Sequence, residues 1–400
     1  MDNTERLPIG RRVAYWRIRR KLSQQLFADR LGKSKSWVDK VERGVRTLDR
    51  LSTLQDIAAV LRIDPAVLLG RVARPVEVDA RAEAVERVRT ALSRYEIPLG
   101  RPTGRRPVLP VDRMAREVTH AWTTFQHARY RQVVELLPDL LVDAPRTHAT
   151  APDTGRALLV DAYRITAALL VKLEVADLAW LAADRAMIAA TGDRTLVAAA
   201  AVQLGQALRA AGRAGTAKSV TLAAAYRIAP TVIEYGTPAD VSLCGTLLVQ
   251  AALAAAQAGD DRATAELIDE ATGMAGHLRD GVDHHHTAFG PTAVALARAA
   301  AAIELGNAHD AIDWHERTTR QAGWRWLPAE HRAAHLVDTA RAYLHVDDVA
   351  NAARVLTEAV QTAPAEIRHR PVARDLLARI ARDPYAPTTV TQLAVTLGLG

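Results

Sequence analysis

Basic side chains gather in one short stretch near the start of the chain. Lys33, Lys35, Lys40 and Arg43 all lie in "LSQQLFADRLGKSKSWVDKVERG", residues 22–44. Cations at this spacing can neutralise the phosphates of a nucleic acid or donate hydrogen bonds to base edges. A pair of solvated helices would carry the same charges, so the apolar positions of the stretch decide between the two interpretations.

The net positive charge of the chain is confined to the same region. Residues 1–74 contain 17 Lys and Arg against 8 Asp and Glu, whereas the remaining residues contain 35 against 37. A basic N-terminal module on a near-neutral body is typical of a protein that contacts a polyanion through one domain.

The apolar positions predict two short helices joined by a turn. Ser23 is suited to cap a helix that runs to about Leu31, and Ser34 is suited to cap a second helix that ends at Gly44. Gly32 allows the sharp turn between them. The side chains expected to face inward are Phe27, Ala28 and Leu31 on the first helix and Val38 and Val41 on the second. This arrangement, with lysines on the outer face of the second helix, indicates a helix-turn-helix.

The stretch is similar to the helix-turn-helix of phage repressor and Cro proteins, called the XRE family, and the similarity extends over residues 8–70. The resemblance implies a five-helix, lambda-repressor-like DNA-binding domain over residues 1–74. Its closing helices would be Leu51–Leu61 and Pro65–Leu69. It also implies a transcriptional regulator that binds a palindromic operator as a homodimer.

The same resemblance assigns roles to individual residues. The expected DNA-binding residues are Gln24, Lys33, Ser34, Lys35, Ser36, Trp37, Asp39, Lys40, Arg43 and Arg46. Lys35, Ser36 and Lys40 would lie along the major groove, and Arg43 and Arg46 would contact phosphates. Gln24 would contact a phosphate and brace the second helix. Arg17 and Glu42 match an ion pair that braces the domain in this family.

Residues 75–110 are expected to join two domains. An amphipathic helix is predicted from about Asp79 to Tyr95, followed by "IPLGRPTGRRPVLP". Because this Pro-, Gly- and Arg-rich stretch cannot continue a helix, it predicts a domain boundary. Its arginines, Arg101, Arg105 and Arg106, would be solvated or would add phosphate contacts.

From residue 111 to 400 the sequence predicts repeated helical hairpins. A turn residue precedes an alanine by five positions in three places, namely Gly212 and Ala217, Gly306 and Ala311, and Asp347 and Ala352. Comparable positions near Val133, Leu178 and Ala265 give six units spaced 39 to 48 residues apart. The surrounding residues fit the tetratricopeptide pattern, although the standard period is about 34 residues. We therefore expect a tetratricopeptide-like, right-handed α-solenoid with a concave inner surface; an irregular helical bundle is the alternative.

An XRE domain followed by such repeats resembles two groups of bacterial regulators. One is actinobacterial, and "LAWLAADRAMIAATGD" (178–193) and "HTAFGPTAVALARAAAAIELGN" (286–307) are like its repeat region. The other, by architecture only, is the peptide-pheromone receptors of Gram-positive bacteria. Asparagines on the inner helices clamp the peptide in that second group, but here asparagine occurs only at positions 3, 307 and 351.

A signal peptide, a small molecule or a small partner protein would bind on the inner helices of the repeats. The repeat phase places seven candidates there: Trp122, Tyr163, Gln206, Arg209, Gln250, Arg341 and His345. Amides, arginines and aromatic rings on one wall suit an extended peptide or an anionic small molecule.

Two other clusters carry residue types that bind metals. They are Asp283–His286 and the group Glu330, His331 and His335. Neither offers three converging ligands, so a loop before a helix and a solvated helix face are expected, with no metal. The sequence contains no P-loop, no HExxH and no nucleophile elbow, which argues against an enzyme and against a cofactor.

Bulk properties point to the cytoplasm. A single cysteine, Cys244, excludes a disulfide framework, no apolar run approaches the length of a membrane span, and the N-terminus lacks a signal-peptide pattern. The sequence thus predicts a cytoplasmic, non-enzymatic regulator whose repeats sense a signal or dock a partner. The alternatives are an interaction scaffold that works through its repeats, and a ligand-independent repressor whose repeats only dimerise.

Overall fold

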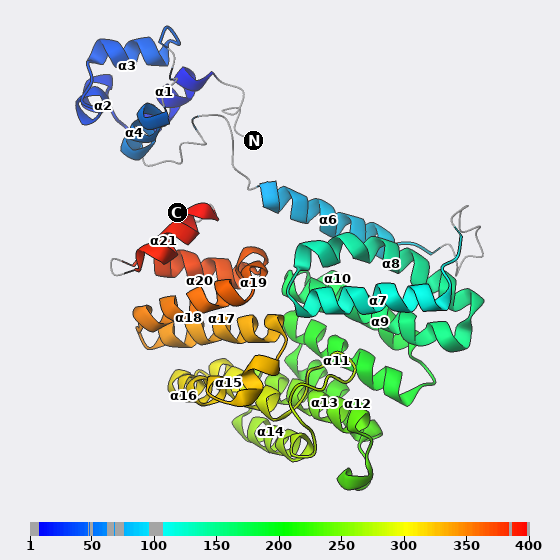
Figure 1. Ribbon diagram of the computed structural model, residues 1–400. Helices are drawn as coiled ribbons and strands as arrows, with labels where there is room; N and C mark the ends of the chain where they lie inside the picture. Colours follow the sequence, from blue (N-terminus) through cyan, green and yellow to red (C-terminus); the bar gives the residue numbers. More distant parts are fainter. Residues whose placement is uncertain are drawn as a thin grey trace. The chain divides into compact units, whose positions relative to one another are not determined.

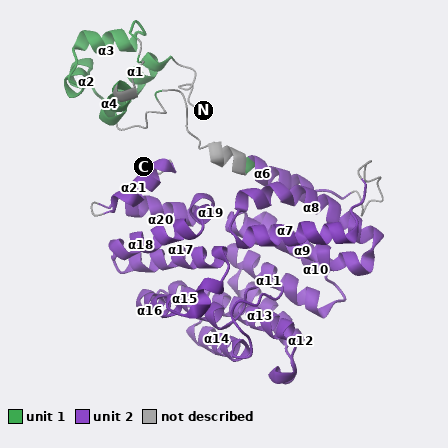
Figure 2. Cartoon of the chain, viewed as in Figure 1, with its two compact units in different colours: residues 1–82 green, residues 83–400 purple. Residues whose placement is uncertain are grey.

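The computed structural model describes residues 8–46, 48, 51–61, 68, 76–95, 107–383 and 386–397. The chain forms two compact units, residues 1–82 and residues 83–400 (Figure 2). All regular structure in the described residues is helical (Figure 1). The expected all-α class, with a helical N-terminal domain followed by helical repeats, is therefore confirmed.

The first unit contains four described helices around one core. They are α1 (Ile9–Arg19), α2 (Gln24–Arg30), α3 (Lys35–Glu42) and α4 (Leu51–Leu61). The buried core contains Val13, Phe27, Ala28, Val38, Val41, Leu48, Leu54, Ile57, Ala58, Leu61 and Leu68. The fifth helix expected at Pro65–Leu69 lies outside the described residues except for Leu68, which is buried in this core.

The boundary between the units differs from the expected position. Helix α6 (Val76–Leu92) crosses it, and Val88 and Leu92 are buried in the same core as Met114 and Tyr130 of the repeats. The apolar stripe on the second half of α6 is covered by the repeat helices, so this half belongs to the second unit. The boundary lies within α6 and not in the Pro-, Gly- and Arg-rich stretch. Arg101, Arg105 and Arg106 lie outside the described residues.

The second unit contains the six predicted helical hairpins. They pair α7 (Val111–Gln126) with α8 (Tyr130–Thr150), α9 (Pro152–Lys172) with α10 (Ala176–Ala189), α11 (Arg194–Ala210) with α12 (Ala214–Ile228), α13 (Pro238–Gln257) with α14 (Asp261–Ala275), α15 (Pro291–Glu304) with α16 (Ala308–Thr319), and α17 (Ala329–His345) with α18 (Val349–Thr362). Three helices follow: α19 (Pro364–His369), α20 (Pro371–Ala381) and α21 (Thr388–Thr396). Two 3-10 helices, η2 (Ile233–Tyr235) and η3 (Ala322–Trp326), lie in the connections.

The six hairpins share one turn geometry. The fourth residue of each second helix is buried: Val133, Ala179, Ala217, Thr264, Ala311 and Ala352. Five positions earlier, each turn has a residue with positive φ: Ala128, Glu174, Gly212, Gly259, Gly306 and Asp347. The predicted pattern therefore extends to all six hairpins. It was misplaced by one residue in two of them, since Ala179 and Thr264 occupy the positions expected for Leu178 and Ala265.

Helix α13 is long and apolar enough to cross a membrane, so the expectation that no such run exists was wrong. Its most apolar window is 83% buried inside the second unit. Helices α11, α12, α14 and α15 pack around it. The composition of α13 is that of a core helix enclosed by its neighbours.

The first and last hairpins of the second unit touch. Helix α17 packs against α7, and α19 packs against α8. Ala333 and Ala363 belong to the same hydrophobic core as Tyr130 and Leu173 of the first two hairpins. The stacked hairpins therefore curve until the two ends of the array meet (Figure 1).

Candidate functional site

Helices α2 and α3 begin at the serines that the sequence indicates. The side chain of Ser23 accepts a hydrogen bond from the backbone N–H of Leu26, and Ser34 accepts one from Trp37, each at 3.1 Å. Gly32 has φ 61° and Gly44 has φ 74°, a conformation that glycine adopts without strain. Caps and glycines thus fix where both helices start and stop.

A buried carboxylate joins three elements of this unit. Arg17 of α1 donates to Glu42 of α3 from Nε (2.5 Å) and from Nη2 (3.0 Å). Gln24, at the start of α2, donates from Nε2 to Oε2 of Glu42 at 2.8 Å. The side chains of Arg17 and Glu42 are only 11% and 6% exposed. Glu42 therefore sets the orientation of α3 against both other helices.

The outer side of α3 and its flanks carry the predicted DNA-binding residues. Those exposed are Lys33, Ser34, Lys35, Ser36, Lys40, Arg43 and Arg46. Gln24, Trp37 and Asp39 are half-buried. Val38 and Val41 are buried on the side of α3 that faces the core, and Lys40 lies on the side that points away from it, while Lys35 is exposed at the first residue of the helix.

Two of these cations are held by neighbours on the same surface. The Arg46 guanidinium lies over the Trp37 ring, 5.9 Å from its centroid. Arg43 pairs with Asp39 at 3.4 Å. Trp37 itself packs partly against the core of the unit, which fixes its ring in place.

The comparisons with known proteins bear first on this unit. The family described as "Helix-turn-helix domain" matches residues 8–69. Residues 8–69 form a helix-turn-helix domain. A search of curated proteins gives no significant match.

One solved structure aligns along most of the chain. It is the crystal structure of Bacillus thuringiensis PlcR in complex with the peptide PapR7 and DNA, with 12% identity and a TM-score of 0.30. The alignment covers 89% of this chain and 94% of that one.

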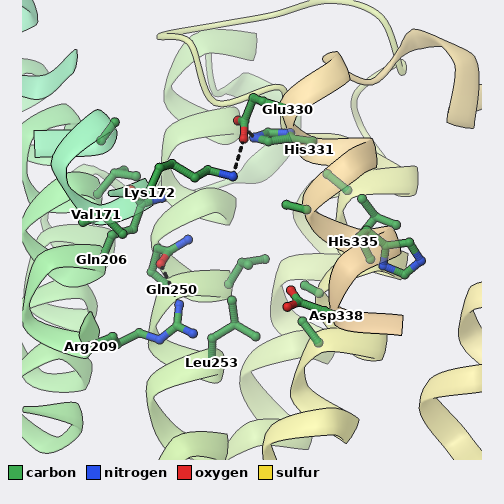
Figure 3. Close-up of a pocket in the computed structure, with 18 of the residues that line it drawn as sticks. Val171, Lys172, Gln206, Arg209, Gln250, Leu253, Glu330, His331, His335 and Asp338 are labelled. Carbon is green, nitrogen blue, oxygen red and sulfur yellow. Dashed lines mark hydrogen bonds and ion pairs between the residues drawn. The ribbon is translucent and has the colours of Figure 1, made fainter. Parts of the chain in front are cut away.

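Beyond the helix-turn-helix domain, the repeats enclose a cavity of about 500 Å³ (Figure 3). The first helix of every hairpin contributes to its wall. Five of the seven predicted inner-wall residues line it: Trp122, Gln206, Arg209, Gln250 and Arg341. Tyr163 and His345 are not among the lining residues. Tyr163 packs against the hydrophobic core, and His345 is exposed with Nδ1 3.0 Å from the carbonyl oxygen of Arg341.

A long loop covers part of the cavity, and we call residues Gly276–Gly290 the His loop. His286 stacks on Trp122 of α7, with ring centroids 4.5 Å apart and planes 8° apart. Arg164 of α9 donates to the carbonyl oxygen of His285 at 2.7 Å. Asp283 accepts a hydrogen bond from Gln126 of α7 at 2.6 Å. The loop before α15 thus returns to the first two hairpins, and His286, Thr287 and Phe289 line the cavity.

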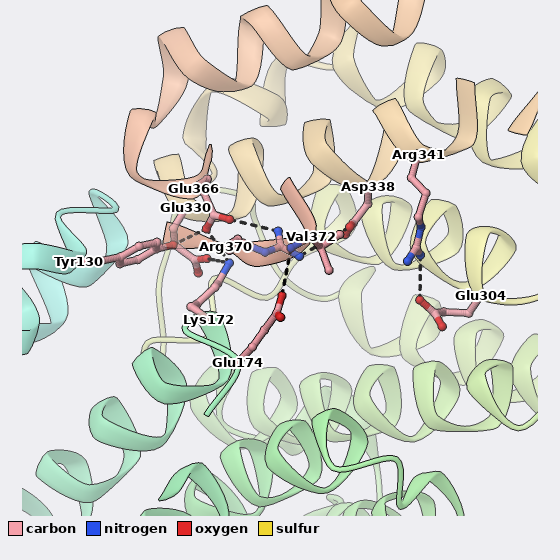
Figure 4. Close-up of polar contacts among 10 residues, drawn as sticks. All are labelled: Tyr130, Lys172, Glu174, Glu304, Glu330, Asp338, Arg341, Glu366, Arg370 and Val372. Atoms are coloured by element: carbon pink, nitrogen blue, oxygen red, sulfur yellow. Dashed lines mark hydrogen bonds and ion pairs between the residues drawn. The ribbon is translucent and has the colours of Figure 1, made fainter. Parts of the chain in front are cut away.

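Buried charges hold the two ends of the repeat array together (Figure 4). We call them the closure cluster: Tyr130, Lys172, Glu330, Glu366 and Arg370. Lys172 lies 2.7 Å from Oε2 of Glu330 and 2.9 Å from Oε1 of Glu366. The Tyr130 hydroxyl also donates to Glu366, and Arg370 pairs with Glu366 at 3.1 Å.

Electrostatics keep the carboxylates of the closure cluster ionised. Burial opposes the charge on Glu330, but His331 and Lys172 outweigh it and lower the pKa of the carboxyl. Burial likewise opposes the charge on Glu366, whose pKa is lowered overall by Lys172 and Arg370. Burial and the charge of Glu366 raise the pKa of the Tyr130 hydroxyl. The cluster is therefore a set of paired charges with Tyr130 as a neutral donor.

The group Glu330, His331 and His335 does not form the expected solvated helix face. Glu330 and His335 are buried, and His331 is half-buried with Nε2 2.9 Å from Glu330. The prediction was wrong because Glu330 is covered where the ends of the array meet, and His335 is covered by His315 and Trp324 from the segments that precede α17. His335 Nε2 lies 3.0 Å from Nδ1 of His315, and burial lowers the pKa of His335 to about 3 and that of His315 to about 4.

Sequence reasoning missed several cavity-lining residues. Lys172, Asp338 and Arg370 line the cavity but gave no signal, because no local pattern marks residues that come together from different hairpins. His331, which was expected on a solvated face, also lines it. Among the described residues, no group of three His, Cys, Asp or Glu is arranged to hold a metal ion.

Proposed function

We propose that this chain is a sequence-specific, DNA-binding transcriptional regulator whose repeat domain senses a ligand. The observation that carries the proposal is the helix-turn-helix domain over residues 8–69, with an exposed cationic face on α3. In this docking geometry the second helix of the motif enters the major groove, and its first residues contact base edges.

The positions on α3 support separate roles for its cations. Lys35 is exposed at the first residue of α3, and Lys40 is exposed on the face opposite Val38 and Val41; at either position lysine can donate to O6 and N7 of guanine. Ser36 shares this face. Arg43 and Arg46 follow the last turns of the helix, a position suited to phosphates. Gln24, fixed by its hydrogen bond to Glu42, contributes a further phosphate contact.

The cavity of the repeat domain is the proposed ligand site. A volume of about 500 Å³ falls in the range of pockets that bind small molecules. Lys172, Glu330 and Arg370 of the closure cluster lie on its wall, so a ligand there contacts both ends of the array. A ligand that fits the closed array better than the open one will shift it toward closure.

The function is tested by selecting duplexes from a random DNA library with the full-length protein. We expect enrichment of a palindrome with half-sites about one helical turn apart, which is the pattern that a homodimer produces. Lys35→Ala and Lys40→Ala should each weaken binding to the selected duplex by about 1 to 3 kcal/mol and relax base preference locally.

The control is Lys218→Ala, which removes a lysine of the repeat domain and should leave DNA binding unchanged. Equal affinity for every duplex at physiological ionic strength would overturn the proposal. So would unchanged selectivity in both α3 variants.

A further inference from the structure

Most cations on the cavity wall already have a carboxylate partner. Arg341 pairs with Glu304 at 3.0 Å, and Lys172 pairs with Glu330 at 2.7 Å. Arg370 pairs with Glu366 at 3.1 Å and lies 3.7 Å from Asp338. These pairs account for the acidic residues of the cavity except Glu174, which accepts a hydrogen bond from the backbone N–H of Val372.

Arg209 differs from these cations. Within the described part of the chain, no carboxylate lies within 4.0 Å of its guanidinium. Its side chain donates to Oε1 of Gln250 at 3.2 Å, while its Nε is buried and has no hydrogen-bond partner. A buried guanidinium N–H with no hydrogen-bond partner is costly to the folded protein unless a ligand completes it.

The charges around Arg209 do not replace a direct partner. Burial lowers the pKa of the Arg209 guanidinium, and the negative charges of Glu304 and Asp338 offset only part of this effect. Both carboxylates are already engaged, by Arg341 and Arg370 respectively. Among the described cations that pair on this wall, Arg209 is therefore the one that keeps a buried hydrogen-bond donor for a ligand.

The surface next to Arg209 combines amides with apolar side chains. Gln206 lies one helical turn before it on α11, and Gln250 faces it from α13 (Figure 3). Apolar side chains on α11, α13 and α15 also line the cavity: Val202, Val249, Leu253, Leu296 and Ile303. A matching ligand has one anionic end with an acceptor for amide N–H groups and an apolar remainder.

We propose that Arg209, assisted by Gln250 and Gln206, binds the carboxylate of a monoanionic ligand whose apolar body fills the rest of the cavity. One unpaired guanidinium matches one negative charge, and its fork of donors fits a carboxylate in a two-point contact. The carboxylate belongs either to a small organic acid or to the C-terminus of a short apolar peptide. This inference rests on the proposed function only in taking the cavity as the ligand site.

The test measures thermal unfolding of the full-length protein with defined acids and their uncharged counterparts. The organic-acid arm uses butanoate, hexanoate and octanoate against the corresponding primary amides. The peptide arm uses acetyl-trileucine with a free C-terminus against the same peptide amidated. We expect the acids of one arm to raise the unfolding midpoint increasingly with apolar size, and the amides to leave it unchanged. The arm that responds identifies the source of the carboxylate.

Arg209→Gln should weaken acid binding by at least about tenfold, because it removes a charge-assisted hydrogen-bonding partner. Arg209→Lys keeps the positive charge but loses the forked pair of donors, so its affinity for the acid should lie between those of the unmodified protein and Arg209→Gln. The matched control is Arg262→Gln, an exposed arginine of α14 that pairs with Glu266. Without ligand, Arg209→Gln should unfold at a midpoint no lower than the unmodified protein, since no carboxylate is left unpaired.

The inference is overturned if no acid of either arm stabilises the protein, if amides act as well as acids, or if Arg209→Gln retains acid binding. Failure of the proposed function is a separate result. Acid binding that depends on Arg209, together with equal affinity for every duplex, would leave the ligand inference intact and remove the DNA-binding role.

Discussion

Arg17 and Glu42 form a two-point ion pair between α1 and α3, with Nε–Oε1 and Nη2–Oε2 distances of 2.5 Å and 3.0 Å. Breaking a largely buried pair leaves one charge without a partner. Arg17→Met should therefore destabilise the helix-turn-helix domain by about 3 kcal/mol, as measured by native-state amide hydrogen exchange in α1 and α3.

Gln24→Ala serves as the control for this pair, since it removes a single hydrogen bond to Glu42 and should cost about 1 kcal/mol. Equal losses in Arg17→Met and Gln24→Ala would show that the ion pair does not brace the domain.

Lys40 and Arg43 are expected to affect DNA binding in different ways. Arg43→Ala should weaken binding to all duplexes alike and reduce the slope of log affinity against log salt concentration by about 1. Lys40→Ala should instead change the ratio between the selected duplex and single-base variants. Fluorescence anisotropy over a salt series separates the two effects. A change in sequence selectivity caused by Arg43→Ala would show that Arg43 contacts bases and not only phosphates.

The crossing of α11 and α12 depends on the absence of a side chain at Gly205. A Cβ added there would lie 2.5 Å from the Cγ2 methyl of Thr221. Gly205→Ala should lower the unfolding free energy of the repeat domain by about 1 to 3 kcal/mol. Adding Thr221→Ser removes the methyl and should restore part of the loss.

The matched control for Gly205 is Gly215→Ala, because nothing lies within 4 Å of the added Cβ at that position. Thermal unfolding that is equally lowered in both single variants would indicate a general effect of replacing glycine and not a close helix crossing.

The closure cluster should control how the ends of the repeat array hold together. Glu366 is fully buried and accepts from Tyr130, Lys172 and Arg370. Glu366→Gln should speed amide hydrogen exchange in α8 and α19 and destabilise the closed array by about 3 kcal/mol. Glu266→Gln, in an exposed pair on α14, is the control and should have little effect. Identical exchange in both variants would contradict a closing role.

The buried pair His315 and His335 should make the repeat domain sensitive to mild acid. Burial lowers the pKa of His315 from 6.5 to about 4 and that of His335 from 6.5 to about 3. In the unfolded chain both imidazoles take up protons below about pH 6.5, so the unfolded state binds more protons and stability falls as the pH drops.

The measurement is the unfolding midpoint between about pH 6.5 and pH 5, above the range in which carboxyls titrate. The raised pKa of His331 acts in the opposite sense, but its contribution is complete below its ordinary value of 6.5. Replacing both His315 and His335 by Phe should reduce the dependence of the unfolding midpoint on pH. The dependence that remains should come from His285 and His286, whose pKa values are also lowered. An unchanged pH dependence in this double variant would show that the acid sensitivity does not come from His315 and His335.

The features that sequence predicted well are local ones. Ser23, Ser34 and Gly32 act through neighbours within a few residues, so their caps and turn could be recognised directly. The turn pattern at Gly212, Gly306 and Asp347 located the hairpins because each hairpin repeats the same local geometry. The second and fourth hairpins were each placed one residue away from the observed position, and the missing glycine signal at Glu174 explains only the second, since the turn of the fourth contains Gly259.

The features that sequence missed depend on distant parts of the chain. Lys172 and Glu366 are 194 residues apart, and no local pattern links them. Glu330 was taken for a solvated residue for the same reason, because its partner Lys172 lies on the second hairpin. Tyr163 was assigned to the inner wall from helical phase alone, but phase does not say which side of a curved array the hydrophobic core will cover.

The meeting of α8 with α19 has a consequence for how the repeat domain comes apart. An open stack of hairpins can fray one unit at a time from either end, since each unit is held only by its neighbours. When the terminal hairpins pack against each other, neither end can unfold by itself, so denaturation should proceed as one cooperative transition. Refolding should be slow, because segments remote in the sequence must come together.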